Sequence, residues 1–298
     1  MRIADEVWSA LARGAGVVAL ESTVIAHGLP RPRNVQVALE LEEIVRQGGG
    51  VPATIAVLDG EPVIGLSQSE LGRIAADDNV LKLSTRELAL AAARKQTGAT
   101  TVAATSFLAR LAGIQVFATG GIGGVHRGVP LDVSADLPEL QRTEIIVVCA
   151  GAKSILDLPA TREMLETLCI PVLGWRTDSF PGFYIRDSGL RVDARIQGAG
   201  EVAELWGMKR KLQVPGGLLV CAPIPAEHAL DAAAIEDSIA AALRAAEEQG
   251  VRGKKITPFL LKNLSENTAG GSLEANVALL RNNTTVATEI AVALAGGG

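Results

Sequence analysis

The sequence predicts an α/β fold, in which a central sheet, mostly parallel or mixed, lies between helices in a three-layer α/β/α arrangement. Short β-branched runs alternate along the chain with longer amphipathic segments, which is typical of strands joined by covering helices. Hydrophobic residues make up 48% of the 298 residues, charged residues 20% and aromatic residues 3%. This balance excludes a largely disordered chain and indicates an aliphatic core, so we expect a single domain over residues 1–298.

The predicted strands are short apolar runs at Val17–Leu20, Thr54–Leu58, Val80–Leu83, Val116–Ala118, Glu144–Cys149, Val172–Gly174 and Leu218–Cys221. Asp59-Gly60 predicts a hairpin turn after the second run, because Asp-Gly is a preferred hairpin dipeptide. The stretch Asp187–Gln213 is polar and contains glycines, so we expect it to be an excursion from the domain.

Helices are predicted where apolar residues fall on one face. Asn34–Gln47 has this pattern, with Gly48 at the C′ position, and Ser84-Thr85-Arg86-Glu87 is a capping box that begins a helix running towards Ala93. The C-terminal part predicts a long Ala-rich helix and three shorter ones, at Ala226–Gln249, Pro258–Leu264, Ser272–Leu280 and Thr284–Ala295.

Charge and hydropathy exclude two classes of partner. The formal net charge is −5 and the chain has no Lys/Arg-rich run, which argues against nucleic-acid binding. The longest apolar runs, Ile145–Gly151 and Gly216–Ala222, are far shorter than the roughly 18 residues of a membrane span. The N-terminus is acidic and unlike a signal peptide, which predicts a cytoplasmic protein. The three cysteines, Cys149, Cys169 and Cys221, lack CxxC spacing, so we expect buried, reduced thiols.

Glu21 is the first candidate for chemistry. The strand Val17–Leu20 ends directly on Glu21, and Ser22, Thr23 and His27 follow. Ligands of open α/β sheets bind at the carboxyl ends of strands, so Glu21 stands where a general acid or base belongs. The alternative is that Glu21 is a salt-bridge partner and His27 a hydrogen-bonded structural residue.

A glycine-rich loop follows the strand Val116–Ala118. It reads Thr119-Gly120-Gly121-Ile122-Gly123-Gly124-Val125-His126-Arg127-Gly128 and matches neither the dinucleotide nor the nucleoside-triphosphate motif. Backbone N–H groups in such a loop can face an anion, so the loop predicts a site for one phosphate or sugar phosphate. The alternative is a turn whose glycines serve only packing.

Asp132 and Asp136 come next, four residues apart. On one helical turn they would face one site, and two carboxylates beside a phosphate loop suit Mg²⁺ or Mn²⁺. Two acids at this spacing are equally typical of a solvated helix start.

Two lysines are candidates for reactive amines. Lys153 follows the buried strand Glu144–Cys149 at the predicted start of a short helix, where burial and the helix end favour the neutral amine that Schiff-base chemistry needs. The alternative is a solvated surface lysine. Lys82, between Leu81 and Leu83, is either an edge-strand residue or a second basic group of the site.

The last candidate segment is Glu266–Asn276. Ser272 could cap a helix that carries Asn276 on its inner face, and such helix starts bind anions. A purely structural capping loop explains the same residues.

Taken together, six motifs resemble those of the pseudouridine-5′-phosphate glycosidase family, also called indigoidine synthase A-like. They run in order along nearly the whole chain, at Ala19–Gly28, Gly98–Thr105, Thr119–His126, Asp132–Asp136, Ala150–Lys153 and Glu266–Asn276. The resemblance implies a three-layer α/β/α fold, a homotrimer, and reversible cleavage of the C–C glycosidic bond of pseudouridine 5′-phosphate to uracil and ribose 5-phosphate in nucleobase catabolism.

The resemblance also implies roles for single residues. Lys153 corresponds to the lysine that forms an imine adduct at C1′ of the opened sugar, and Glu21 to the proton donor. Asp132 corresponds to the ligand of a divalent metal, Mn²⁺ in the family, held largely through water. Substrate contacts are implied for Lys82, Val102, Ser134, Ala135 and Asp136, and contacts to the phosphate and ribose for Thr119, His126 and Asn276.

One departure and two rival functions remain. Family members often have Gly-Gly-Lys-Ser where this chain has Ala269-Gly270-Gly271-Ser272, which removes a possible basic contact to phosphate. The rivals are another lysine-imine lyase or aldolase acting on a sugar phosphate, and a non-catalytic accessory protein that binds a sugar phosphate. The combination of Glu21, Lys153 and Asp132 argues against the second, because a binding protein needs no amine nucleophile.

Overall fold

The structure is a computed structural model that describes residues 1–128, 131–251, 259–260, 263–264, 268 and 270–296. Within them the main sheet has the strand order β1-β4-β3-β2-β7-β9-β13-β11-β12, with β6 beside β3 and β5 beside β6. The strands are β1 Arg2–Ile3, β2 Val17–Glu21, β3 Val51–Leu58, β4 Glu61–Ile64, β5 Leu81–Leu83, β6 Gly98–Thr100, β7 Val116–Ala118, β9 Ile146–Cys149, β11 Val172–Trp175, β12 Ala194–Ile196 and β13 Leu218–Cys221.

The sheet is mixed, as the alternation of strands and helices predicts. All neighbours from β3 to β12 along the main order are parallel, whereas β4 and β6 pair antiparallel with β3. The hairpin between β3 and β4 turns at Asp59 and Gly60, whose φ angles of 50° and 85° are both positive. A small second sheet joins β8 Val125–His126 to β10 Leu156–Asp157 in antiparallel pairing.

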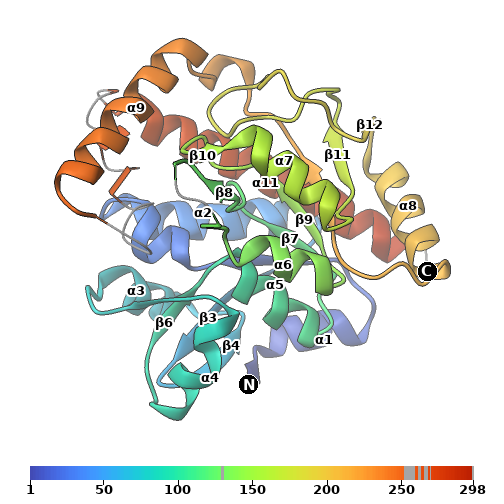
Figure 1. Ribbon diagram of the computed structural model, residues 1–298. Coiled ribbons are helices and arrows are strands. Elements are labelled where there is room, and N and C mark those ends of the chain that lie inside the picture. Colours follow the sequence, from blue (N-terminus) through green and yellow to red (C-terminus); the bar gives the residue numbers. More distant parts are fainter. Residues whose placement is uncertain (129–130, 252–258, 261–262, 265–267, 269, 297–298) are drawn as a thin grey trace.

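Helices cover both faces of the sheet (Figure 1). The helices α2 Arg33–Gln47, α8 Ala199–Lys211 and α11 Gly271–Gly296 pack together on one face, and α5 Val102–Leu111 and α6 Asp136–Arg142 lie on the other. The remaining helices are α1 Asp5–Ala12, a π-helix at Val24–Gly28, α3 Gln68–Ala76, α4 Thr85–Ala93, α7 Leu158–Thr167, a 3-10 turn at Ala226–His228 and α9 Ala232–Glu248.

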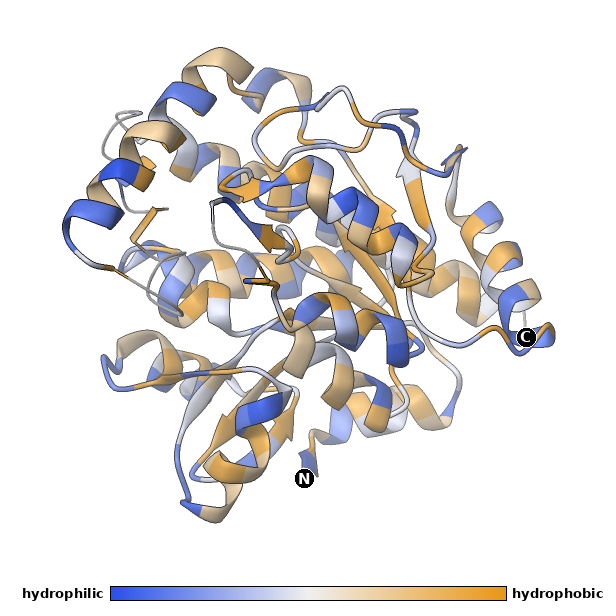
Figure 2. Ribbon diagram, in the orientation of Figure 1, coloured by the Kyte–Doolittle hydropathy of each residue, from blue (hydrophilic) through white to orange (hydrophobic). Residues whose placement is uncertain are grey.

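The core lies between these layers and is aliphatic. The central strands are mostly orange in Figure 2, and every residue of β2, β3, β7, β9 and β13 is buried. Valine and isoleucine suit such strands because their branched side chains pack well on a pleated surface covered from both sides. Each helix in the described parts of the chain is too short or too polar to cross a bilayer.

Several expectations for the C-terminal half were wrong. The helices expected at Ser272–Leu280 and Thr284–Ala295 are one continuous helix, α11, and the helix expected from Ala226 begins only at Ala232, where Asp231 caps it. Asp187–Gln213 is no excursion, because it contributes β12 to the main sheet and α8 to the layer around α11. Of the helix expected at Pro258–Leu264, residues 259, 260, 263 and 264 are helical, and residues 258, 261 and 262 lie outside the described residues.

Two local expectations also need correction. Gly48 keeps a negative φ, and Gly49, with φ of 85°, takes the left-handed position after α2. Cys149 and Cys221 are buried as expected, whereas Cys169 is exposed at the end of α7, with a positive φ of 55°. Both differences arise at helix ends, where one residue must reverse the chain direction and its identity is set by the turn that follows.

Candidate active site

The candidate site lies at the carboxyl ends of β2, β7 and β9. From β2 the chain crosses to β3 on one side, and from β7 it crosses to β9 on the other, so the connections leave the β2–β7 pair in opposite directions. In open α/β sheets ligands bind at such a switch point. Glu21 ends β2, Thr119 follows β7, and Lys153 lies four residues after the end of β9.

Two cavities meet at this point. The larger, of about 430 Å³, and the smaller, of about 60 Å³, share Glu21, Thr23, Lys82 and Lys153 in their walls. The larger cavity is also lined by most of the predicted substrate and metal residues, namely Val102, His126, Asp132, Ser134, Ala135 and Asp136. The smaller is also lined by Val24, His27, Gly28, Gly120, Gly121, Phe183 and Asn276.

Glu21 is a buried acid, only 9% exposed. Its Oε1 accepts a hydrogen bond from the Thr119 hydroxyl. Burial raises the pKa of Glu21, an effect that the charge of Lys153 and the Thr119 hydrogen bond oppose. Because burial dominates, the carboxyl keeps its proton to higher pH than an exposed glutamate, which suits a proton donor and disfavours the salt-bridge alternative.

Lys153 lies in a loop and not at the start of a helix, so the helix part of its prediction was wrong. Its backbone N–H donates to the carbonyl of Ile122 at 3.1 Å, and the N–H of Ile122 donates to the carbonyl of Gly151 at 3.0 Å. These bonds fix the lysine loop to the glycine-rich loop. No hydrogen bond joins the Lys153 amine to another residue that the structure describes, and the side chain lines both cavities.

Gly121 and Gly123 of the Thr119–Gly128 loop are required by packing, and Gly120 and Gly121 also line the smaller cavity. A Cβ at Gly121 would lie 2.5 Å from the Phe183 ring, and one at Gly123 would lie 2.2 Å from Ser134 Oγ. The N–H groups of Ile122, Gly123 and Val125 are bonded to Gly151, Asp136 and Thr161 respectively. These N–H groups therefore hold the loop in place and do not face an anion.

A different feature suits an anion, the start of α5. The helix begins at Val102, which lines the larger cavity, and Lys82 on β5 lines the same cavity. The first N–H groups of a helix lack partners within the helix and favour negative charge, and at α5 the carboxylate of Asp136 already accepts one of them, that of Ala103. Lys82 thus lies at the site, as expected for a second basic group. It is also an edge-strand residue, because among the described strands β5 pairs with β6 alone.

Asp132 and Asp136 do not share a helical turn, because α6 begins at Asp136 and residues 132–135 are not helical. Asp136 is buried and accepts N–H bonds from Ala103 at 2.9 Å and Gly123 at 2.8 Å. Its carboxylate thus joins the start of α5 to the glycine loop. The predicted two-aspartate metal site is wrong in this respect.

Asp132 alone suits a metal held mainly by water. Its side chain is 36% exposed to the larger cavity, and His126 Nδ1 lies 3.4 Å from Oδ1. Among the described residues no three His, Cys, Asp or Glu side chains form a ligand cluster. Mg²⁺ and Mn²⁺ are commonly bound through one or two carboxylates, several waters and a substrate phosphate, so a single carboxylate fits these ions and not a closed protein cage.

The three residues expected to hold the phosphate and ribose are distributed over different places. His126 lines the larger cavity and Asn276 the smaller, while Thr119 is 1% exposed and donates its hydroxyl to Glu21. Ser272 does not cap α11, because it lies within the first turn of the helix. Its N–H donates to the hydroxyl of Thr268 at 3.1 Å.

Sequence reasoning missed Phe183 as a wall of the smaller cavity. The residue has a φ of 63°, rare for a bulky side chain, and its N–H donates to the carbonyl of Ala150 at 2.9 Å. A cluster of aromatic residues in a chain with so few of them was the only signal in the sequence. His27 also lines this cavity, and burial followed by the charge of Lys82 lowers its pKa.

Comparisons with known proteins agree over nearly the whole length. Residues 6–293 match the family model described as indigoidine synthase A like protein. A pseudouridine-5′-phosphate glycosidase of Chloroflexus aurantiacus is 56% identical, with 98% of each chain covered. One of Symbiobacterium thermophilum is 53% identical, covering 98% of this chain and 97% of the relative.

Two solved structures are also similar. An indigoidine synthase A-like protein from Thermotoga maritima has a TM-score of 0.90 at 43% identity, covering 95% of this chain and 94% of that one. The prealnumycin C-glycosynthase AlnA, solved in complex with ribulose 5-phosphate, has a TM-score of 0.92 at 38% identity, covering 99% and 97% respectively.

Proposed function

Since the chain belongs to the indigoidine synthase A-like family, we propose that it is a pseudouridine-5′-phosphate glycosidase. It reversibly cleaves the C–C glycosidic bond of pseudouridine 5′-phosphate to uracil and ribose 5-phosphate. Relatives that carry this name at 56% and 53% identity support the activity, and the pentose phosphate bound to the structural neighbour supports the substrate class. The observation that carries the proposal is that Glu21 and Lys153 share the walls of both cavities.

The chemistry uses one amine and one acid. Glu21 gives a proton to the ring oxygen of the sugar as the C1′–O bond opens, and the amine of Lys153 adds to C1′. The proton released from nitrogen returns to Glu21, which passes it to the uracil carbon. The C–C electron pair then returns to the uracil ring while the nitrogen lone pair forms the C1′ iminium, and water hydrolyses this iminium to free ribose 5-phosphate and the amine.

The two cavities suit the two halves of the substrate. The larger cavity, with the start of α5 and Lys82, takes the ribose phosphate, because a helix start and an ammonium favour phosphate oxygens. The uracil lies towards Phe183 and Asn276, where one aromatic face and one amide are present. Because the smaller cavity has little volume, the base occupies the entrance of that cavity, next to Glu21.

A divalent ion, Mn²⁺ or Mg²⁺, completes the proposal. Asp132 would hold it together with water, and the ion would supply positive charge beside the substrate phosphate. Direct measurement of Mn²⁺ binding by electron paramagnetic resonance tests this assignment independently of turnover. We expect Asp132→Asn to weaken binding about tenfold or more, and unchanged binding would contradict the role of Asp132.

The assembly and location are proposed from the family. We propose a cytoplasmic homotrimer, and an apolar patch on α4 and α5 is available for its contacts: Leu90, Phe107 and Leu111 are 49%, 40% and 61% exposed, and the two helices pack against each other. Sedimentation velocity gives the oligomeric state. Replacing Phe107 and Leu111 with Glu is expected to dissociate the trimer if this patch is the interface.

Uracil release from pseudouridine 5′-phosphate tests the activity, with borohydride trapping of a ribose 5-phosphate adduct as the test of the amine. We expect wild type to release uracil and to be labelled at Lys153. Turnover of an aldehyde or ketose phosphate without uracil release would favour an aldolase-like enzyme. Binding of ribose 5-phosphate without any turnover would favour an accessory protein.

A further inference from the structure

The long helix α11 places two asparagines on its inner face, two helical turns apart. Asn276 lines the smaller cavity, and Asn283, seven residues further on, faces the beginning of the glycine-rich loop. Residues seven positions apart point in nearly the same direction on a helix of 3.6 residues per turn. The helix therefore reaches the catalytic centre at two levels.

Asn283 makes an unusual set of contacts for a helix residue. It is 0% exposed, and its Nδ2 donates to the carbonyls of Thr119 at 2.8 Å and Gly120 at 3.2 Å. Carbonyl oxygens only accept, so the amide nitrogen must face the loop. Its Oδ1 has no partner among the described residues, although a buried acceptor without a partner is costly. An apolar residue would avoid that cost, so the two donated bonds are what the asparagine contributes.

The loop residue that Asn283 holds is itself bonded to the acid. The Thr119 N–H donates to the carbonyl of Val148 at 3.0 Å, and the Thr119 hydroxyl donates to Glu21 Oε1. Because its N–H and its carbonyl are both bonded, the backbone of Thr119 is held at the distance from which its hydroxyl reaches Glu21. A hydroxyl that donates to Oε1 leaves the other carboxyl oxygen of Glu21 as the one that carries the transferable proton.

We propose that Asn283 is a positioning residue, which acts through Thr119 to fix the orientation of the proton donor Glu21. The proposal rests on the proposed function, since it assigns a partner to the acid of that reaction. Asn283 touches neither the cavities nor the amine, so it does not contact substrate.

A titration separates this role from a merely structural one. The Thr119 hydrogen bond lowers the pKa of Glu21, as do the nearby charges of Lys153 and Lys82, while burial and the charge of Asp136 raise it. Releasing Thr119 therefore raises the pKa of Glu21 further. Because the protonated acid is the active form in cleavage, the alkaline limb of the kcat profile moves to higher pH.

The experiment is a double-mutant cycle of Asn283→Ala and Thr119→Val, with Asn282→Ala as the matched control. Asn282 is the adjacent asparagine, and its side chain donates to the carbonyl of Pro223 at 3.3 Å, away from Glu21. We expect Asn283→Ala to lower kcat about 10- to 100-fold with KM changed less than about threefold, and to move the alkaline limb upward. In the Thr119→Val background the same change is expected to have no further effect on kcat or the limb.

Three outcomes would each overturn the proposal. They are additive effects of the two substitutions on kcat, an alkaline limb that does not move in Thr119→Val, and an equal loss of kcat in Asn282→Ala. If Asn283→Ala does not fold by circular dichroism, Asn283→Leu fills a similar volume without the amide and serves in its place. Difference infrared titration of the Glu21 carboxylic acid, with Glu21→Gln as the reference, needs no substrate. A wild type without uracil release would thus refute the proposed function, while an unchanged infrared pKa in Thr119→Val would refute this inference alone.

Discussion

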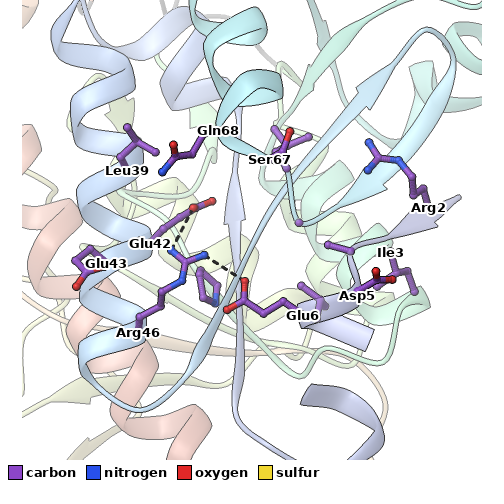
Figure 3. A pocket seen from close by; sticks show the side chains of 15 residues that line it. Arg2, Ile3, Asp5, Glu6, Leu39, Glu42, Glu43, Arg46, Ser67 and Gln68 are labelled. Carbon is purple, nitrogen blue, oxygen red and sulfur yellow. Dashed lines mark hydrogen bonds and ion pairs between the residues drawn. The ribbon is translucent and has the colours of Figure 1, made fainter. Parts of the chain in front are cut away.

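A groove beside the N-terminal segment is larger than the candidate active-site cavity, about 750 Å³ against about 430 Å³, yet both of its arginines are already paired with glutamates. We call it the N-terminal groove; its walls include Arg2, Glu6, Leu39, Glu42, Arg46, Ser67 and Gln68 (Figure 3). Arg46 reaches between Glu42 and Glu6, as the dashed lines show, and Arg2 pairs with Glu70.

Both regions contain a buried glutamate that accepts a threonine hydroxyl. In the groove Thr54 donates to Glu42 at 2.6 Å, and in the active site Thr119 donates to Glu21. Burial raises the pKa of both acids. The difference is the opposing group: Arg46 carries a guanidinium, which is no nucleophile, whereas Lys153 carries a primary amine, the group that imine chemistry uses. The size of a hollow therefore says less about function than the kind of cation beside its acid.

The sharpest test of this comparison removes the amine. Lys153→Ala is expected to lower kcat for uracil release by about 10⁴-fold or more, because the covalent adduct of the proposed mechanism forms on this amine. Loss of the borohydride-trapped adduct is the accompanying measurement. A folded Lys153→Ala enzyme with wild-type activity would contradict the proposed mechanism.

The second test exchanges the two acids for their amides. Glu21→Gln keeps a hydrogen-bond acceptor for Thr119 but cannot donate the proton, so we expect kcat to fall on the order of 10²- to 10³-fold. Glu42→Gln is the matched control and is expected to retain wild-type kcat. Equal losses in both variants would show that the comparison between the two acids is mistaken.

The third test is the pH dependence of stability. Folding raises the pKa of Glu21, so between the unfolded and folded pKa values the folded state binds more protons, and the free energy of unfolding falls as pH rises through that window. Glu21→Gln removes this pH-dependent fall in the free energy of unfolding and is expected to stabilise the protein by about 1 kcal/mol at neutral pH. Urea denaturation at several pH values measures it, and a variant less stable than wild type at neutral pH would contradict the sign.

The smallest effect is expected at Arg46. Its side chain is 42% exposed, and solvent screens such pairs, so Arg46→Gln is expected to cost less than about 1 kcal/mol. Uracil release should be unaffected, because the N-terminal groove lies apart from Glu21 and Lys153. A large fall in kcat would give the groove a role in turnover that its paired arginines do not suggest.

The sequence predicts the parts of this molecule that depend on local pattern. The strand ends at Glu21 and Cys149, the hairpin at Asp59-Gly60 and the capping box at Ser84 all follow from neighbouring residues, and the structure confirms them. The placement of reactive side chains at strand ends follows from the same patterns, since the carboxyl ends of parallel strands meet at one edge.

What could not be predicted depends on contacts between distant residues. Asn282-Asn283-Thr284 resembles a helix break, yet α11 continues through it, and the side chain of Asn283 bonds to the glycine-rich loop. Phe183 enters the site only because its backbone is bonded to Ala150 from another strand end. The carboxylate of Asp136 is bonded to the N–H groups of Ala103 and Gly123, two contacts that no spacing reveals.

The position of α11 in the chain has a consequence for biosynthesis. This helix begins at Gly271, packs against β2, β7 and β9, and brings both Asn276 and Asn283 to the site. A nascent chain without α11 leaves part of the apolar face over β2, β7 and β9 uncovered. It also lacks Asn283, the residue that holds Thr119 beside Glu21. The central sheet must therefore wait, during translation, for a segment made some 250 residues after β2, and catalytic competence arrives only once α11 has left the ribosome.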